Sequence, residues 1–111
     1  MTDNDSSLSG TEEISFGIIA SAGQARSYAL EALQKARKGA FDEAHELLAQ
    51  SKEAALQAHH VQMNLLSQEA NGDHVAVDVM LVHAQDHLMC ALLAQELAGE
   101  LVNLYETKQD R

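Results

Sequence analysis

With 111 residues, 17 of them acidic and 7 basic, the chain is the size of one domain and carries a formal net charge of −10. This charge argues against binding to nucleic acid or to an anionic membrane surface, because both need clustered Lys and Arg side chains. A single cysteine excludes an internal disulfide, and neither a signal peptide nor a bilayer-length apolar run is present, so we expect a cytoplasmic protein with no direct membrane insertion.

The composition favours an all-α domain. There is no Pro and no Trp, and the aromatic residues are limited to 2 Tyr and 2 Phe. The abundant Ala, Leu, Glu and Gln are good helix formers and supply little material for strands. Residues 1–11 are polar or acidic and predict a disordered N-terminal tail, which leaves residues 12–111 as one helical domain.

The first predicted helix runs from about Thr11 to Lys38, where small and apolar residues recur at alternating spacings of three and four. Its stripe consists of Ile14, Ile18, Ala22, Ala25, Ala29, Ala32 and Ala36. Gly39 is the expected left-handed cap, and the basic residues before it suit the last turn of a helix. The basic cluster therefore indicates a helix end rather than a binding patch.

The second predicted helix begins near Asp42, a good N-cap, and runs to about Gln68. Its stripe consists of Ala44, Leu48, Ser51, Ala55, Ala58, Gln62 and Leu65. His59 and Gln62 share a face, where they either line a groove beside the third helix or form an interhelical hydrogen bond. Residues 71–73 then break the pattern, and Asp73 could cap the next helix.

The third predicted helix extends from about Asp73 or His74 to Lys108. Residues 74–79 alternate apolar and polar, which alone predicts a strand, but the long helical continuation and the lack of a partner strand favour a helix. One core stripe consists of Val77, Leu81, Ala84, Leu88, Ala91, Ala98, Val102 and Tyr105, and a second of Val79, Val82, Met89, Leu93 and Leu97. A three-helix bundle needs only the first stripe, so the second predicts that this helix packs against copies of itself.

Two imidazoles and a carboxylate interrupt this apolar helix. His83, Asp86 and His87 share a face, because residues three and four apart are neighbours on a helix. A neutral imidazole is a nucleophile that can carry a phosphoryl group. Asp86 lies in the second stripe, where an unpaired carboxylate is costly to bury. In a three-fold assembly, three copies of Asp86 would converge, and a hard divalent cation would neutralise them.

Other interpretations of this cluster remain open. His83 and His87 have the spacing of a zinc site, but the spacing is common and Ala84 replaces the glutamate of the zincin motif. One alternative is a non-enzymatic metal-binding helical scaffold with His83, Asp86 and His87 as ligands. Another is a histidine phosphotransfer domain of two-component signalling, although such domains usually show His-x-x-Lys-Gly and residues 84–87 differ from it.

The segment Val82-His-Ala-Gln-Asp-His-Leu-Met89 resembles the signature of the enzyme IIA component of the lactose/cellobiose (chitobiose) class of the bacterial phosphoenolpyruvate-dependent sugar phosphotransferase system. The resemblance continues in residues 21–27, 31–36 and 58–62, and spans the chain from about Glu12 to Lys108. It implies an antiparallel three-helix bundle that associates as a homotrimer, a nine-helix assembly. His60 and Met63 stand where relatives commonly have leucine and threonine.

The resemblance also implies a reaction. His83 would accept a phosphoryl group from the phosphohistidine of the carrier protein HPr and pass it to a cysteine of enzyme IIB, which phosphorylates sugar during transport through the membrane enzyme IIC. The protein would then be a phosphotransferase component with a covalent phosphohistidine intermediate. Gln85 and His87 are candidates to contact phosphoryl oxygens. Asp86 matches an aspartate of the family that binds Mg²⁺, one ion per trimer shared by three chains.

Overall fold

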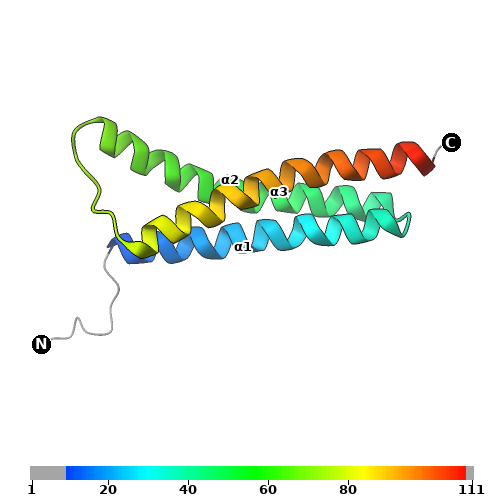
Figure 1. The fold of residues 1–111 in the computed structure, drawn as a ribbon, viewed down its shortest axis with the longest axis horizontal. Helices are drawn as coiled ribbons and strands as arrows, with labels where there is room; N and C mark the ends of the chain where they lie inside the picture. Colours follow the sequence, from blue (N-terminus) through cyan, green and yellow to red (C-terminus); the bar gives the residue numbers. More distant parts are fainter. Residues whose placement is uncertain (1–9, 110–111) are drawn as a thin grey trace, which may run out of the picture.

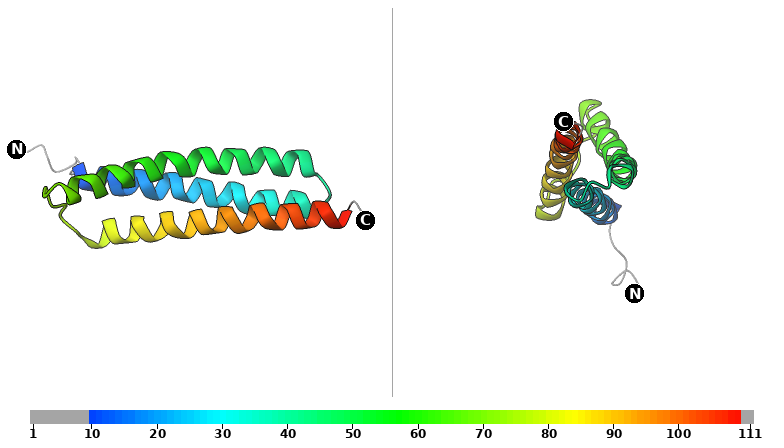
Figure 2. Two further views of the ribbon diagram at one scale, coloured as in Figure 1. Left: turned by 90° about the horizontal axis from the view of Figure 1, so that it is seen from above. Right: turned by 90° about the vertical axis from the view of Figure 1, so that its right-hand side faces the viewer.

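The computed structural model describes residues 10–109, which fold into three helices without any strand. These are α1 (Gly10–Arg37), α2 (Phe41–Ala70) and α3 (Val79–Gln109), which lie along one long axis and alternate in direction (Figure 1). Seen along that axis, the helices occupy the corners of a triangle (Figure 2). The expected all-α, antiparallel three-helix bundle is confirmed. Most of the predicted N-terminal tail lies outside the described residues, while its last two residues, Gly10 and Thr11, belong to α1.

In the turn between α1 and α2, the predicted end of α1 agrees with the structure, whereas the predicted start of α2 does not. Gly39 has a φ of +81°, and the backbone N–H of Ala40 donates to the carbonyl of Lys35 at 2.9 Å, so the predicted left-handed cap is confirmed. The predicted N-cap at Asp42 is wrong, because α2 begins one residue earlier and Ala40 occupies the capping position without a side-chain hydrogen bond. The short turn leaves Phe41 packed against the buried cluster of Ala36, Ala44 and Val102 and their neighbour Ala32.

The start of α3 differs from the prediction. The helix begins at Val79, and residues 73–78 form an irregular connection in place of the expected first turn. Asp78 is the cap, since its Oδ1 accepts a hydrogen bond from the N–H of Leu81 at 2.9 Å. The alternating, valine-rich stretch before it favours extended backbone, so the strand-like pattern described this segment better than the helical one. Val77 is consequently 72% exposed and lies outside the core.

The core is built mainly from alanine. All seven predicted stripe positions of α1 except Ile14 are buried, and Ile18, Leu88 and Val102 are the largest apolar side chains that are fully enclosed. Small side chains let helices approach closely but bury little apolar area per residue. α1 packs extensively against both α2 and α3, whereas α2 and α3 contact each other much less and separate towards the end where residues 71–78 connect them (Figure 1).

A short chain of polar side chains links the three helices inside this core. Ser51 on α2 is fully buried, and its hydroxyl donates to the backbone carbonyl of Ala25 on α1 at 2.7 Å. The Nε2 of Gln95 on α3 donates to the same hydroxyl at 3.0 Å. Both hydrogen-bonding capacities of Ser51 are therefore used, which removes the penalty for burying a hydroxyl group.

The α2–α3 connection is held by the carboxylate of Glu69. Its Oε1 accepts the backbone N–H of Val75 at 2.9 Å, and its Oε2 pairs with Nδ1 of His74 at 2.5 Å. The hydrogen bond from Val75, and after it the one from His74, holds the pKa of the Glu69 carboxyl below its ordinary value of 4.5. The ionised carboxylate thus closes the connection over the end of α2.

We expect Glu69→Gln to destabilise the protein in a pH-dependent way. Because the pKa of Glu69 is lower in the folded than in the unfolded state, its contribution is present above the ordinary pKa and is lost as the pH falls through the lowered value. The difference in free energy of unfolding between wild type and Glu69→Gln should therefore be largest near neutral pH and disappear in acid. Urea unfolding followed by circular dichroism between about pH 7 and about pH 3 measures this difference, and a constant value would contradict the role of Glu69.

Candidate functional site

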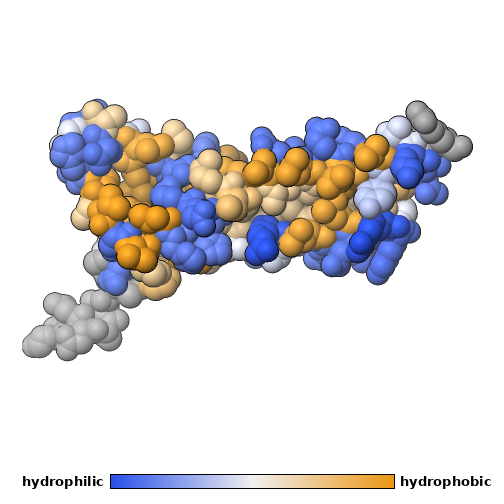
Figure 3. Space-filling view, viewed as in Figure 1, coloured by the Kyte–Doolittle hydropathy of each residue, from blue (hydrophilic) through white to orange (hydrophobic). Residues whose placement is uncertain are grey.

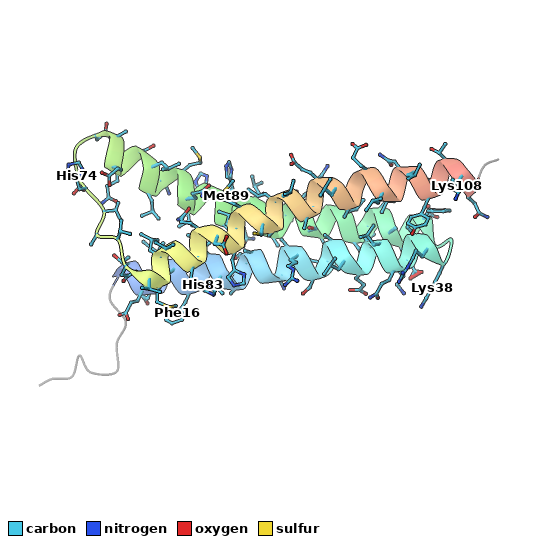
Figure 4. The ribbon with its side chains drawn as sticks, in the orientation of Figure 1. Phe16, Lys38, His74, His83, Met89 and Lys108 are labelled. Carbon is cyan, nitrogen blue, oxygen red and sulfur yellow. The ribbon has the colours of Figure 1, made fainter. Side chains whose placement is uncertain are left out.

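His83 and His87 form a pair near the start of α3. Their Nε2 atoms lie 3.1 Å apart, and the two rings meet edge to face at a centroid distance of 4.5 Å and an interplanar angle of 86°. One of the two Nε2 atoms must carry a proton for this hydrogen bond, so each ring constrains the tautomer of the other. His83 is exposed and His87 is partly buried. Figure 4 shows His83 and Met89 on different sides of α3.

Asp86 does not join the histidine pair in a single chain. Asp86 lies between the two histidines in the sequence, and its side chain is exposed. Its Oδ1 lies 3.8 Å from Sγ of Cys90, one turn further along α3. Within residues 10–109 no three His, Cys, Asp or Glu side chains are arranged to hold a metal ion. The ligand set that the metal-binding scaffold would use is therefore not assembled by one chain.

Gln85 lies on the other side of α3 from His83. Residues two apart on a helix do not face each other, so the two side chains cannot meet on one phosphoryl group within a chain. Gln85 instead accepts a hydrogen bond at its Oε1 from Nε2 of Gln62, a largely buried residue of α2 that also contacts Sδ of Met89 at 3.6 Å. Because Oε1 of Gln85 is occupied in this way, its amide N–H groups are the ones left to donate elsewhere.

Gln62 has both of the roles that the sequence leaves open, since it forms an interhelical hydrogen bond and lines a groove beside α3. The hydrogen bond joins α2 to α3 beside an apolar groove of about 230 Å³. Residues of α2, of the connection and of the start of α3 line this groove, among them Leu65, Leu66, Val75, Val77, Leu81 and Val82. His59 lines a different hollow, together with Lys52 and Gln95.

The second apolar stripe predicted for α3 is exposed in the isolated chain. The residues of this face are Val79, Val82, Met89, Leu93, Leu97, Leu101 and Leu104. Figure 3 shows the hydrophobic surface following α3 along the molecule. Asp86 and Cys90 lie within the face by their helical positions, and both are exposed. An apolar strip of this length is uncommon on a monomeric protein and is typical of an interaction surface.

None of the helices formed by residues 10–109 is both long and apolar enough to cross a membrane.

Comparison with known proteins identifies relatives over nearly the whole chain. Residues 13–106 match the family model described as the lactose/cellobiose-specific IIA subunit of the phosphotransferase system. The chain is 44% identical over 93 residues to the lactose-specific EIIA component of Staphylococcus epidermidis, a match that covers 84% of this chain and 89% of that protein.

Two solved structures share the fold. The crystal structure of the cellobiose-specific enzyme IIA from Bacillus anthracis superposes with a TM-score of 0.89 at 43% identity, covering 94% of this chain and 95% of that one. A chain in the solution structure of the IIA(chitobiose)–HPr complex from Escherichia coli gives a TM-score of 0.78 at 41% identity, covering 92% and 99% of the two chains.

Proposed function

Because the chain belongs to the lactose/cellobiose-specific IIA family of the sugar phosphotransferase system, we propose that His83 is the residue that carries its phosphoryl group. The protein is a IIA component of this type and thus a phosphotransferase component of the system. The main support for His83 is its exposed ring on a rigid helix, with its Nε2 held by His87. A related chain has been solved in complex with HPr, which supports HPr as the phosphoryl donor.

In the proposed reaction, the phosphorus–nitrogen bond in phosphorylated HPr breaks while a new one forms to His83. The phosphoryl group then passes to the cysteine thiolate of enzyme IIB, which works with the membrane enzyme IIC. A protein that exchanges phosphoryl groups with HPr and enzyme IIB in this way would act in the cytoplasm. Attack requires a nitrogen lone pair on His83 in line with the leaving nitrogen. When His87 carries the shared proton on Nε2, the lone pair on Nε2 of His83 accepts that hydrogen bond, so attack requires the N–H of His87 to turn away from it. Once it has left the lone pair of His83, the N–H of His87 is placed to donate to the incoming phosphoryl oxygens.

The exposed face of α3 supports a homotrimer as the working assembly. Three copies of the face packed about one axis would cover the apolar strip and give nine helices in total. The face contains one acidic residue among its apolar members near the start of α3, Asp86, so three carboxylates would approach the axis at one level.

The three carboxylates form a donor set that suits Mg²⁺, a hard cation that prefers oxygen ligands. One chain supplies only one of them, so the proposed site holds one ion per trimer, shared by Asp86 of three chains. The bound ion would offset the repulsion between the carboxylates. Asp86 points to Cys90 rather than to the histidine pair in the single chain, which favours a structural role for the ion over one in phosphoryl transfer.

The position of Gln85 acquires a function in this assembly. In a cyclic trimer each interface joins one side of α3 to the opposite side of the next copy. His83 and Gln85 flank Asp86 on opposite sides of the helix, so packing about Asp86 brings Gln85 of one copy beside His83 of its neighbour. Gln62 orients the Gln85 amide with its donor groups free, as contact with phosphoryl oxygens requires. We therefore assign His87 to the site of its own chain and Gln85 to that of a neighbouring copy.

We expect His83→Ala to abolish phosphorylation while the fold and assembly survive. Incubation with phosphoenolpyruvate, enzyme I and HPr should add one acid-labile phosphoryl group per wild-type chain, measured by intact mass, and none to His83→Ala. His60→Ala, which changes an exposed histidine of α2, should be labelled like wild type. Labelling of His83→Ala, or no labelling of wild type by active HPr, would contradict the assignment, and the second outcome would favour the metal-binding scaffold.

Asp86→Leu should remain trimeric and become more stable in Mg²⁺-free buffer. Replacing converging buried carboxylates with apolar side chains is expected to raise the free energy of unfolding by about 1 kcal/mol or more per chain. Added Mg²⁺ should raise the melting temperature of wild type but not of Asp86→Leu. Sedimentation equilibrium and thermal melts test both expectations, and a monomeric Asp86→Leu protein would contradict the axial position of this residue.

A mixing experiment separates the two placements of Gln85. Gln85→Ala alone should accept phosphoryl about tenfold more slowly, since one hydrogen bond to the transferred group is lost. Co-refolding Gln85→Ala with equal amounts of His83→Ala places intact Gln85 beside intact His83 at about half of the phosphorylatable chains. About half of the labelling should then regain the wild-type rate. Labelling that stays uniformly slow in mixed trimers would show that Gln85 acts within its own chain.

A further inference from the structure

The separation of the two histidine nitrogens suits a second kind of ligand. Two imidazole nitrogens bound to one ion at a Zn–N distance of about 2.0–2.1 Å stand roughly 2.8–3.4 Å apart for angles of about 90–110° at the metal. The Nε2 atoms of His83 and His87 are 3.1 Å apart and face each other. Rotation of the two rings about their side-chain bonds would direct both lone pairs at one ion.

The helix holds this pair in place. Residues four apart on an α-helix lie one above the other, and two histidines at this spacing are a common arrangement for binding zinc on one helix face. His83 is exposed and His87 is partly exposed, so an ion has access from solvent.

Within one chain, the remaining coordination positions fall to water. No third His, Cys, Asp or Glu side chain within residues 10–109 completes a cluster with this pair, and Asp86 contacts Cys90 instead. An ion held by two nitrogens and water is exchangeable, unlike one in a closed structural site.

We propose that His83 and His87 bind one divalent transition-metal ion through their Nε2 atoms, in competition with the phosphoryl group. Imidazole nitrogen selects ions such as Zn²⁺, Ni²⁺ and Cu²⁺, whereas Mg²⁺ prefers oxygen. The site therefore differs from the one proposed at Asp86 in both its ligands and its ion.

The ion and the phosphoryl group exclude each other for a simple reason. The ion takes the place of the proton that the two Nε2 atoms share and uses the lone pair of His83 that the proposed transfer needs. A chain with bound metal cannot accept a phosphoryl group at that atom, and phosphorylated His83 cannot chelate the metal. By linkage, each ligand must weaken the binding of the other to the same degree. Metal binding stands independently of the proposed function, and only the exclusion rests on it.

Calorimetric titration of the full chain with Ni²⁺ tests the binding. Wild type should bind one Ni²⁺ per chain, and both His83→Ala and His87→Ala should lower the affinity at least tenfold. His60→Ala, an exposed histidine on α2, serves as the matched control and should bind like wild type. Excess Mg²⁺ should not displace the nickel. Equal affinity in wild type and His87→Ala would overturn the proposal.

Phosphorylation by HPr tests the exclusion. Wild type loaded with Ni²⁺ should accept phosphoryl at least tenfold more slowly, and a chelator should restore the rate. As a control, phosphorylation of HPr by enzyme I is measured at the same nickel concentration. Phosphorylated wild type should no longer bind Ni²⁺. Full-rate phosphorylation of the nickel-loaded protein would overturn the exclusion. Nickel binding that depends on both histidines in a protein that HPr never phosphorylates would leave the site in place and reject the proposed function.

Discussion

The design of the molecule depends on α3 being apolar on two faces. One face, with Leu88 at its centre, is buried against α1, while the other, with Val82 and Leu93, is exposed in the single chain. A helix that is apolar around most of its circumference belongs in the interior of a structure. The bundle of one chain presents such a helix at its surface, so polar residues on it are expensive unless they act in chemistry or assembly. That constraint singles out His83, Asp86 and His87.

Much of the fold could be predicted because helical spacing reports directly on faces. The alanines of α1, the left-handed turn at Gly39 and the two faces of α3 all follow from local order in the sequence. Helix starts were harder, since Asp73 and Asp78 are equally good caps as residue types. The choice between them depends on the distance that the connection must cover from the end of α2, which is a property of the packed bundle. The same distance leaves Val77 outside the core.

In the candidate site, too, contacts within one helix could be predicted, whereas contacts between helices could not. The contact between His83 and His87 follows from their spacing on one helix, as does the separation of His83 from Gln85. The hydrogen bond from Gln62 to Gln85 does not, because it depends on how α2 is rotated and placed relative to α3. A glutamine within an apolar stripe of α2 was the available signal, and it indicated a buried partner without identifying it.

The hydroxyl of Ser51 has a consequence for where chemistry happens. Alanines resemble one another, so an alanine-rich interface would lose few contacts if α3 slid along its neighbours by one turn. Such a slide would strand Ser51 without Gln95 and would shift His83 by about 5.4 Å along the bundle. This buried hydrogen bond therefore fixes the axial register of α3 relative to α2. It sets the height at which the reactive imidazole meets a partner protein, although it lies three turns away from that imidazole along α3.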